Sequence, residues 1–214
     1  MIRPTMFLLI MAAWLVWPLE TYVWAAETVD FDDFTVGGPI AYAAADRYGA
    51  QGIIFLTPIP IEDVQQAEPS YYPSFQATGG SGTNGLSLSL VWSQLSIQGA
   101  FKIPGTSIRG ITDYVAVDGF DTEIGTVNGL LDVFDVDGNL IDSLSIVTPP
   151  STHSFFSISH PGIASLRLSM DGDGGIWDNL TFNTPTAPIP APAALALGYI
   201  GVGLVGWLRR RRAI

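Results

Sequence analysis

The chain is built from short runs of alternating or β-branched residues, and glycine, asparagine, aspartate or proline separates one run from the next. In "LSLSLVW" leucines occupy positions 86, 88 and 90 with serines between them, so a strand here has one apolar and one polar face. No segment carries a sustained 3.6-residue apolar period, and "IEDVQQAE" is a helix candidate of only eight residues. The pattern predicts an all-β core.

About ten short strands separated by turn residues favour an antiparallel β-sandwich with a jelly-roll-like topology. The stretch Thr57–Thr83 is expected to be a long surface loop because it is rich in glycine and proline. If Phe155 and Phe156 share a strand, they point to opposite faces. The expected strands are Val29–Phe34, Gly52–Leu56, Leu86–Val91, Leu95–Ile103, Ile111–Val117, Leu130–Val136, Leu140–Val147, Ser154–Ser159, Ile163–Met170 and Ile176–Phe182.

The stretch "LLDVFDVDGNLIDSLSIV" predicts a hairpin, because two β-rich runs flank Asp137-Gly138, a dipeptide that tolerates the positive φ of a tight turn. Its centre, "DVDGN", also resembles the start of an EF-hand loop. No glutamate follows at the twelfth position of that loop, where calcium would need a bidentate ligand. The hairpin is therefore the favoured interpretation.

The first 26 residues have the layout of a secretory signal peptide, with Arg3, an apolar run from Met6 to Trp17 and small residues at Ala25 and Ala26. A permanent N-terminal anchor is the alternative. The apolar run is short for a membrane span and Pro18 interrupts it, which favours cleavage near Ala25 or Ala26.

Between Glu27 and Pro185 the chain has four basic and nineteen acidic residues, a formal net charge of −15. Such a surface repels phosphate backbones, so nucleic acid is not an expected partner. It attracts divalent cations, although self-repulsion that favours solubility explains the charge equally well. The chain has no cysteine, which excludes disulfides, thiolate nucleophiles and zinc sites that need sulfur.

After the β pattern, the segment 183–192 reads as a proline-rich linker, followed at 193–214 by a short apolar transmembrane segment with an arginine-rich end. The positive-inside rule places the arginines in the cytoplasm and the β domain, 27–182, outside. The expected sorting motif comprises Ala187, Pro188, Ile189, Pro190 and Ala191, and the basic cluster comprises Arg209, Arg210, Arg211 and Arg212.

This order of proline motif, short glycine-rich span and terminal arginines resembles the PEP-CTERM sorting signal of Gram-negative bacteria. "APIPA" is most similar to the VPLPA variant of that signal, and Ile189 stands where the namesake motif has glutamate. The resemblance implies that an exosortase recognises and removes the tail after a transient stop in the inner membrane. It also implies a surface or extracellular-matrix protein, in the context of exopolysaccharide and biofilm.

The core resembles proteins that carry this tail, through "VDFDDF", "YGAQGIIF", "GTNGLSLSL" and "DGDGGIWDNLTF". This resemblance implies a jelly-roll domain like those of carbohydrate-binding modules, with no activity attached. Carbohydrate contacts are expected from exposed aromatic side chains, and Trp177 in the last strand is expected to be core instead. The candidates for carbohydrate contact are Tyr71, Tyr72 and Trp92.

The first and last strands of a jelly roll can lie close together, which would bring two aspartate groups into one cluster. Calcium takes six to eight oxygen ligands, including carbonyls from irregular backbone, and "MDGDGG" offers such backbone. The alternative is that these aspartates occupy turns, where they form Asx-turns. The candidate ligands of a structural calcium are Asp30, Asp32, Asp171, Asp173 and Asp178.

The sequence contains no pattern typical of a catalytic site. It has two histidines, His153 and His160, and no G-x-S-x-G nucleophile elbow. The favoured function is therefore an exported, non-catalytic protein at the cell surface or in the matrix, which binds carbohydrate or contributes to structure. The alternatives are a glycan hydrolase or lyase on the same scaffold, and a surface adhesin.

Overall fold

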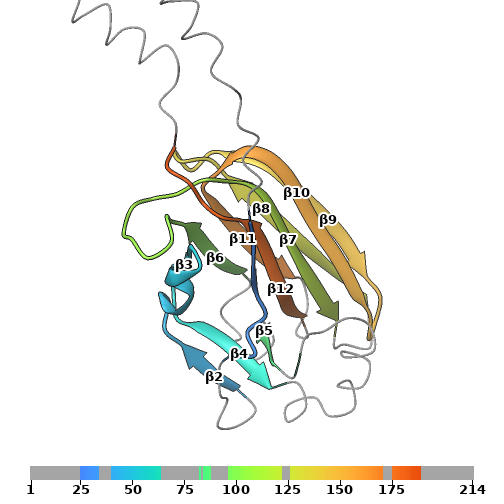
Figure 1. The fold of residues 1–214 in the computed structure, drawn as a ribbon. Coiled ribbons are helices and arrows are strands. Elements are labelled where there is room, and N and C mark those ends of the chain that lie inside the picture. Colours follow the sequence, from blue (N-terminus) through green and yellow to red (C-terminus); the bar gives the residue numbers. More distant parts are fainter. Residues whose placement is uncertain are drawn as a thin grey trace, which may run out of the picture.

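The computed structural model describes residues 25–33, 40–63, 82, 84–87, 96–121, 126–170 and 175–188. These residues form two antiparallel β-sheets that pack face to face, as the strands in Figure 1 show. The all-β antiparallel sandwich predicted from the sequence is confirmed, and its crossing pattern is consistent with a jelly-roll-like arrangement.

The described elements are twelve strands and one short 3₁₀ helix, η1. Their bounds are β1 Ala26–Val29, β2 Ile40–Ala43, η1 Arg47–Ala50, β3 Ile53–Phe55, β4 Ile59–Asp63, β5 Asn84–Ser87, β6 Ser96–Phe101, β7 Thr112–Asp121, β8 Val127–Phe134, β9 Leu140–Thr148, β10 His153–Ile163, β11 Ser165–Met170 and β12 Gly175–Asn183.

The seven-stranded sheet has the order β10-β7-β12-β5-β4-β2, and β1 also pairs with β12. The five-stranded sheet has the order β3-β6-β11-β8-β9. One edge of β12 is paired with β7, while its other edge is shared by β5 in its first part and by β1 in its last part. The last strand therefore binds together elements from the beginning, the middle and the end of the chain.

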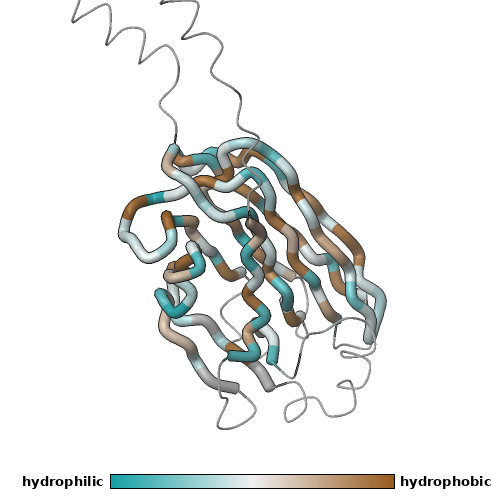
Figure 2. Tube along the Cα trace, in the orientation of Figure 1, coloured by the Kyte–Doolittle hydropathy of each residue, from teal (hydrophilic) through white to brown (hydrophobic). Residues whose placement is uncertain are grey.

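The core lies between the sheets because hydrophobic residues alternate with polar ones along the strands, as Figure 2 shows by colour. On β11, for example, Leu166 and Leu168 are buried while Arg167 between them is partly exposed. Each fully buried side chain of this size contributes about 1.5–3 kcal/mol relative to an exposed one. The alternation thus sets both the register and the inward face of each strand.

Phe156 of β10 and Trp177 of β12 form the aromatic centre of this core, with ring centroids 4.9 Å apart in an edge-to-face arrangement. Both side chains are fully buried. They fit because Gly119 of β7 and Gly129 of β8 leave space beneath them. A Cβ atom at Gly129 would lie 2.4 Å from Phe156 Cζ, and one at Gly119 would lie 2.9 Å from Phe156 Cε2.

The hairpin prediction is confirmed: β8 and β9 pair antiparallel on either side of the turn at 135–139, where Gly138 has φ +85°. The prediction for the two phenylalanines is confirmed as well, since Phe156 is fully buried and Phe155 is 60% exposed. Trp177 is buried, as expected of a core residue.

The predicted strand Val29–Phe34 is wrong from Asp30 to Asp33, and Phe34 lies outside the described residues. The strand occupies Ala26–Val29, and the chain then turns, because Phe31 adopts φ +61° and buries its ring. The alternation of "VDFDDF" looks like a strand, but a left-handed residue rather than an extended one brings the phenylalanine inside.

The predicted loop Thr57–Thr83 is wrong at Ile59–Asp63, and the helix candidate "IEDVQQAE" is wrong in its described part, Ile61–Asp63. Ile59–Asp63 is strand β4, which pairs with β2 and β5. Pro60 sits within this strand, where the sequence alone suggested a break, and Ile61 is part of the hydrophobic core.

Of the predicted leader, 1–26, residues 1–24 lie outside the described residues, as does the predicted apolar tail, 193–214. Within the described part of the chain, no helix has the length and apolar character needed to cross a membrane.

We expect Gly129→Ala to lower the free energy of unfolding by about 1–3 kcal/mol, because its methyl group overpacks the space that Phe156 fills. Urea unfolding followed by tryptophan fluorescence measures this loss. In the double variant with Phe156→Leu the two losses should not add, since the smaller side chain makes room for the methyl group. If the losses of the two single variants add in the double variant, the Phe156 ring is not what makes a side chain at position 129 unfavourable.

Candidate functional site

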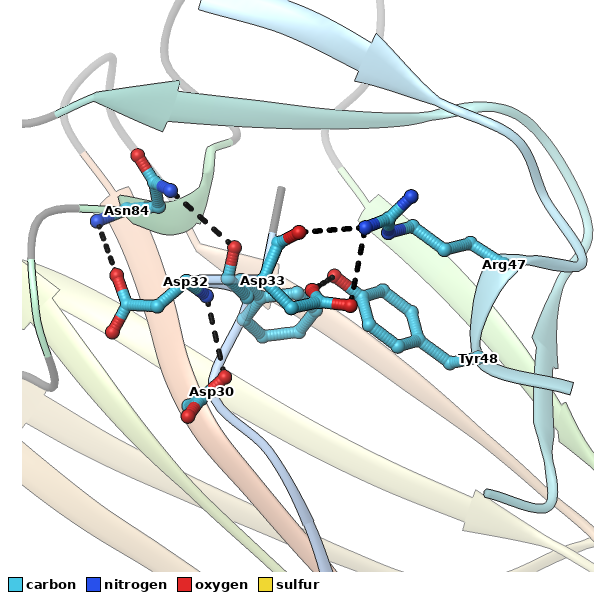
Figure 3. Close-up of polar contacts among 7 residues, drawn as sticks. Asp30, Asp32, Asp33, Arg47, Tyr48 and Asn84 are labelled. Atoms are coloured by element: carbon cyan, nitrogen blue, oxygen red, sulfur yellow. Dashed lines mark hydrogen bonds and ion pairs between the residues drawn. The ribbon is translucent and has the colours of Figure 1, made fainter. Parts of the chain in front are cut away.

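The aspartates after β1 form a turn that is tied to β5 (Figure 3). The Asp32 backbone N–H donates to Asp30 Oδ1 at 3.3 Å, an Asx-type contact. The backbone N–H of Asn84 donates to Asp32 Oδ1 at 3.0 Å, and its side-chain amide donates to the Phe31 carbonyl at 3.5 Å. These two predicted calcium ligands therefore make contacts that hold the turn in place.

Asp33, in the same turn, anchors the 3₁₀ helix η1 (Figure 3). Arg47 donates to the Asp33 carbonyl at 2.7 Å and to its carboxylate at 3.1 Å, while the Tyr48 hydroxyl donates to that carboxylate at 2.9 Å. Burial of the Tyr48 phenol, and then its hydrogen bond to Asp33, raise the pKa of Tyr48 well above its ordinary value. Tyr48 therefore remains a neutral donor at physiological pH.

Asp178 lies in β12, fully buried and in register with Asp118 of β7. The β1–β12 pairing confirms that the first and last strands are neighbours. Between Asp178 and Thr181 the register shifts, and Asn179 takes φ +51°. Its backbone N–H donates to Asp178 Oδ1 at 2.8 Å, and its amide donates to Asp118 Oδ2 at 3.0 Å. The bulge thus aims an amide at one of two adjacent carboxylates.

Asp171 and Asp173 lie outside the described residues. Over the ranges the structure describes, no three histidine, aspartate or glutamate side chains gather where they could hold a metal ion. Calcium binding therefore stays a prediction. The predicted carbohydrate contacts Tyr71, Tyr72 and Trp92, the motif residues Ile189, Pro190 and Ala191, and Arg209 to Arg212 also lie outside these ranges, while Ala187 and Pro188 are described and exposed.

The structure points to a different surface, the outward face of the five-stranded sheet. Three strands place polar side chains there in register: Asp132 of β8 is opposite Arg167 of β11 on one side and Ser143 of β9 on the other. Arg167 donates to Asp132 Oδ2 from Nε at 3.0 Å and from a terminal nitrogen at 2.5 Å. The Ser143 hydroxyl donates to Asp132 Oδ1 at 2.6 Å.

This arrangement fixes an arginine on an otherwise open surface. The Asp132 side chain is 3% exposed, whereas that of Arg167 is 40% exposed, so the guanidinium still faces solvent. Its Cζ atom lies 5.6 Å from the centre of the Phe134 ring, a cation–π contact on the same face. Gln98 of β6 is in register with Arg167 and is exposed. Planar polar groups from neighbouring strands therefore stand side by side.

At one end of this face lies a groove with a volume of about 280 Å³. Arg109 contributes a positive charge to it and donates to the Val136 carbonyl of the β8–β9 turn at 2.6 Å. The groove is lined by Leu56, Ala100, Arg109, Asp135, Val136, Asp137, Gly138, Ala164 and Ser165.

Asp135 organises the turn that forms one wall of this groove. Its carboxylate accepts hydrogen bonds from the backbone N–H groups of Asp137 and Asn139, at 2.9 and 2.8 Å, and from the Asn139 side chain at 2.9 Å. The Asn139 contacts, first the side chain and then the backbone, lower the pKa of Asp135 below its ordinary 3.8. The turn is therefore stabilised by an ionised carboxylate, and that stabilisation is lost as the pH falls through the lowered pKa.

Sequence reasoning missed this face because Gln98 and Arg167 come from strands that are far along the chain from the β8–β9 hairpin. The signal that was present is local: in "SLRLSM" and "LLDVF" a charged residue sits between buried leucine or valine residues. That spacing puts the charge on the outward face. It does not reveal that Arg167 and Asp132 are strand neighbours.

No protein-family model matches this chain, and no curated protein matches it. Among solved structures, the chain is similar to the K2 cleaved adhesin domain of Lys-gingipain, with 12% identity over 74% of this chain and 98% of that chain, at a TM-score of 0.42. It is similar to TmCBM61 in complex with β-1,4-galactotriose, with 16% identity over 72% and 94%, at a TM-score of 0.37.

A third similar structure is the family 11 carbohydrate-binding module of the cellulosomal cellulase Lic26A-Cel5E of Clostridium thermocellum. The identity is 11%, the match covers 77% of this chain and 97% of that module, and the TM-score is 0.33. All three TM-scores are below 0.5, so these similarities assign no function to this chain.

We expect Arg167→Ala to lower the free energy of unfolding by about 1–3 kcal/mol, because the buried Asp132 carboxylate loses both hydrogen bonds from its charged donor. Arg167→Lys should lose less, since lysine keeps the charge but not the fork of donors. Chemical unfolding of both variants measures the difference, with Ser165→Ala on the same strand as the control. Equal stability of the alanine variant and the wild type would contradict a structural ion pair.

Proposed function

We propose that this chain is an exported, non-catalytic β-sandwich protein that binds carbohydrate at the cell surface or in an exopolysaccharide matrix. The observation that carries the proposal is the fixed Arg167–Asp132 pair on an open sheet face beside the groove that contains Arg109. These groups are held by contacts within the protein, so they are oriented before any ligand arrives.

The chemistry of this face suits a polyhydroxylated ligand. Guanidinium and amide groups, at Arg167 and Gln98, donate hydrogen bonds to sugar oxygens, and the carboxylates at the groove accept from sugar hydroxyls. Ser165 and Ala100, which line the groove beside these groups, have small side chains and leave room for a ligand that contacts both. The formal net charge of −15 between Glu27 and Pro185 disfavours the binding of polyanions and favours neutral glycans.

A glycan hydrolase or lyase on this scaffold is the second candidate. The acid of a glycosidase needs a raised pKa so that it is protonated at neutral pH. Hydrogen bonds from the Asn139 side chain and from the turn backbone lower the pKa of Asp135, the carboxylate that shapes the groove, so it does not suit the role of that acid. His160 contacts its own neighbour, the Pro161 carbonyl, at 2.8 Å.

Delivery to the surface by an exosortase is the second part of the proposal. Its support is the order of "APIPA", apolar span and four arginines at the C-terminus, together with the exposure of Ala187 and Pro188. We propose the inner membrane as a transient partner and calcium as a candidate structural cofactor. A surface adhesin that contacts protein is the remaining alternative.

We expect the purified protein to bind at least one neutral glycan in an affinity-electrophoresis panel of xylan, cellulose derivatives, mixed-linkage β-glucan and galactan, run with and without calcium. Gln98→Ala should weaken that binding about tenfold, the equivalent of one hydrogen bond to a charged or well-oriented group. Ser157→Ala, exposed on the other sheet, serves as the control. Release of reducing sugar would favour the enzyme, and attachment to cells without glycan binding would favour the adhesin.

We expect the C-terminal tail to be absent from the mature protein in cells that contain an exosortase and present in cells that lack it. The reason is that the motif, the span and the arginines form a removable signal rather than a lasting anchor. Intact-mass measurement of the C-terminus in the two strains decides the matter. A tail that persists in both strains would refute exosortase sorting.

A further inference from the structure

The chain does not leave the sandwich where its last strand ends. Beyond β12, the backbone N–H and the side-chain hydroxyl of Thr184 donate to the Ala25 carbonyl at 3.0 and 2.8 Å. Ile111 and Thr186 then exchange two backbone hydrogen bonds, at 2.8 and 2.9 Å. We refer to Thr184–Thr186 as the clasp. It lies within the segment that the sequence assigned to a linker.

Pro185, at the centre of the clasp, is buried in a notch between two glycines. A Cβ atom at Gly52 would lie 2.9 Å from Pro185 Cδ, and one at Gly110 would lie 2.8 Å from Pro185 Cβ. Only residues without a side chain leave room for the ring at this place. Immediately afterwards the chain becomes exposed, at Ala187 and Pro188, the first two residues of the sorting motif.

We propose that the clasp sets the upstream limit of C-terminal processing: the processing enzyme cuts after Ala187 or later, and the mature protein keeps Thr184–Thr186. This inference rests on the proposed exosortase processing and adds the position at which the fold permits it. The folded sandwich thus limits how much of the C-terminal tail the processing enzyme can reach.

The physical reason is that a peptidase takes up its substrate as extended backbone, whose N–H and C=O groups must be free. In the clasp those groups are engaged with Ala25 and Ile111, and the proline ring is packed. Cleavage there requires local opening first, so its rate follows the small population of the open state. Ala187 and Pro188 are exposed, so cleavage after Ala187 requires no such opening.

The clasp has one half that depends on the predicted leader and one that does not. Ala25 lies on the leader side of the predicted cleavage site, so leader removal takes away the acceptor of both Thr184 hydrogen bonds. The Ile111–Thr186 pair and the Pro185 notch involve only residues of the core. The second half therefore still holds the chain after export.

The experiment is to express the full chain in cells with an exosortase and to determine the mature C-terminus by intact mass. The wild type should end at Ala187 or later, with a single dominant species. A variant in which Thr184, Pro185 and Thr186 are all replaced by glycine should acquire additional ends at or before residue 186. Thr28→Val, which removes a hydroxyl contact of 3.1 Å to Thr181 on the same β1–β12 pair, is the control and should keep the wild-type end.

Amide hydrogen exchange provides a second measurement, since the Thr186 and Ile111 amides should be protected in the wild type and not in the glycine variant. A wild-type end at or before Thr186 would overturn the inference, as would an unchanged end in the glycine variant once this protection is lost. Retention of the whole tail in every variant would instead refute the proposed processing. The position of the cut and its occurrence are thus tested separately.

Discussion

The pairing of β12 with three other strands is the constraint on which the rest of the structure depends. This strand supplies the central position of the seven-stranded sheet, between β7 on one side and β5 and β1 on the other. It also carries Trp177 into the core and leads directly into the clasp. Because its partners come from distant parts of the chain, its docking closes the sandwich only after most of the chain is available.

The Trp177 site also shows how glycines shape this fold without forming turns. Gly119 and Gly129 lie on strands of different sheets and leave room for the same pair of rings. In the interior of a strand glycine costs conformational entropy, and it is usually a weak choice. Here that cost is offset by the burial of two large aromatic side chains, Phe156 and Trp177, between the sheets.

The sequence predicts the strands better than it predicts their partners. The alternation of "SLRLSM" and the turn residues around Asp137-Gly138 identify β11 and the β8–β9 hairpin, because these signals are local. The contact of Arg167 with Asp132 depends on which strands are neighbours, and a two-residue period contains no such information. Phe31 shows the opposite error, since a strand-like pattern conceals a left-handed turn.

The acidic turn after β1 could be predicted in its composition but not in its role. Aspartates in such a pattern suit both a cation site and an Asx-turn. Asp32 and Asp33 acquire their contacts from Asn84, Arg47 and Tyr48, residues at quite different positions in the chain. A proline-rich end is equally ambiguous, because Pro185 reads as linker until the glycine notch that receives it is known.

The contact between Ala25 and Thr184 has a geometric consequence for the folded domain. It places the entry and the exit of the folded chain at the same pole of the sandwich, as Figure 1 shows. Because β1 and β12 are antiparallel and Ala26 pairs with Asn183, a force that separates the two ends peels these strands apart from that pole. Their hydrogen bonds then break one after another rather than together, as they would if the strands were sheared along their length.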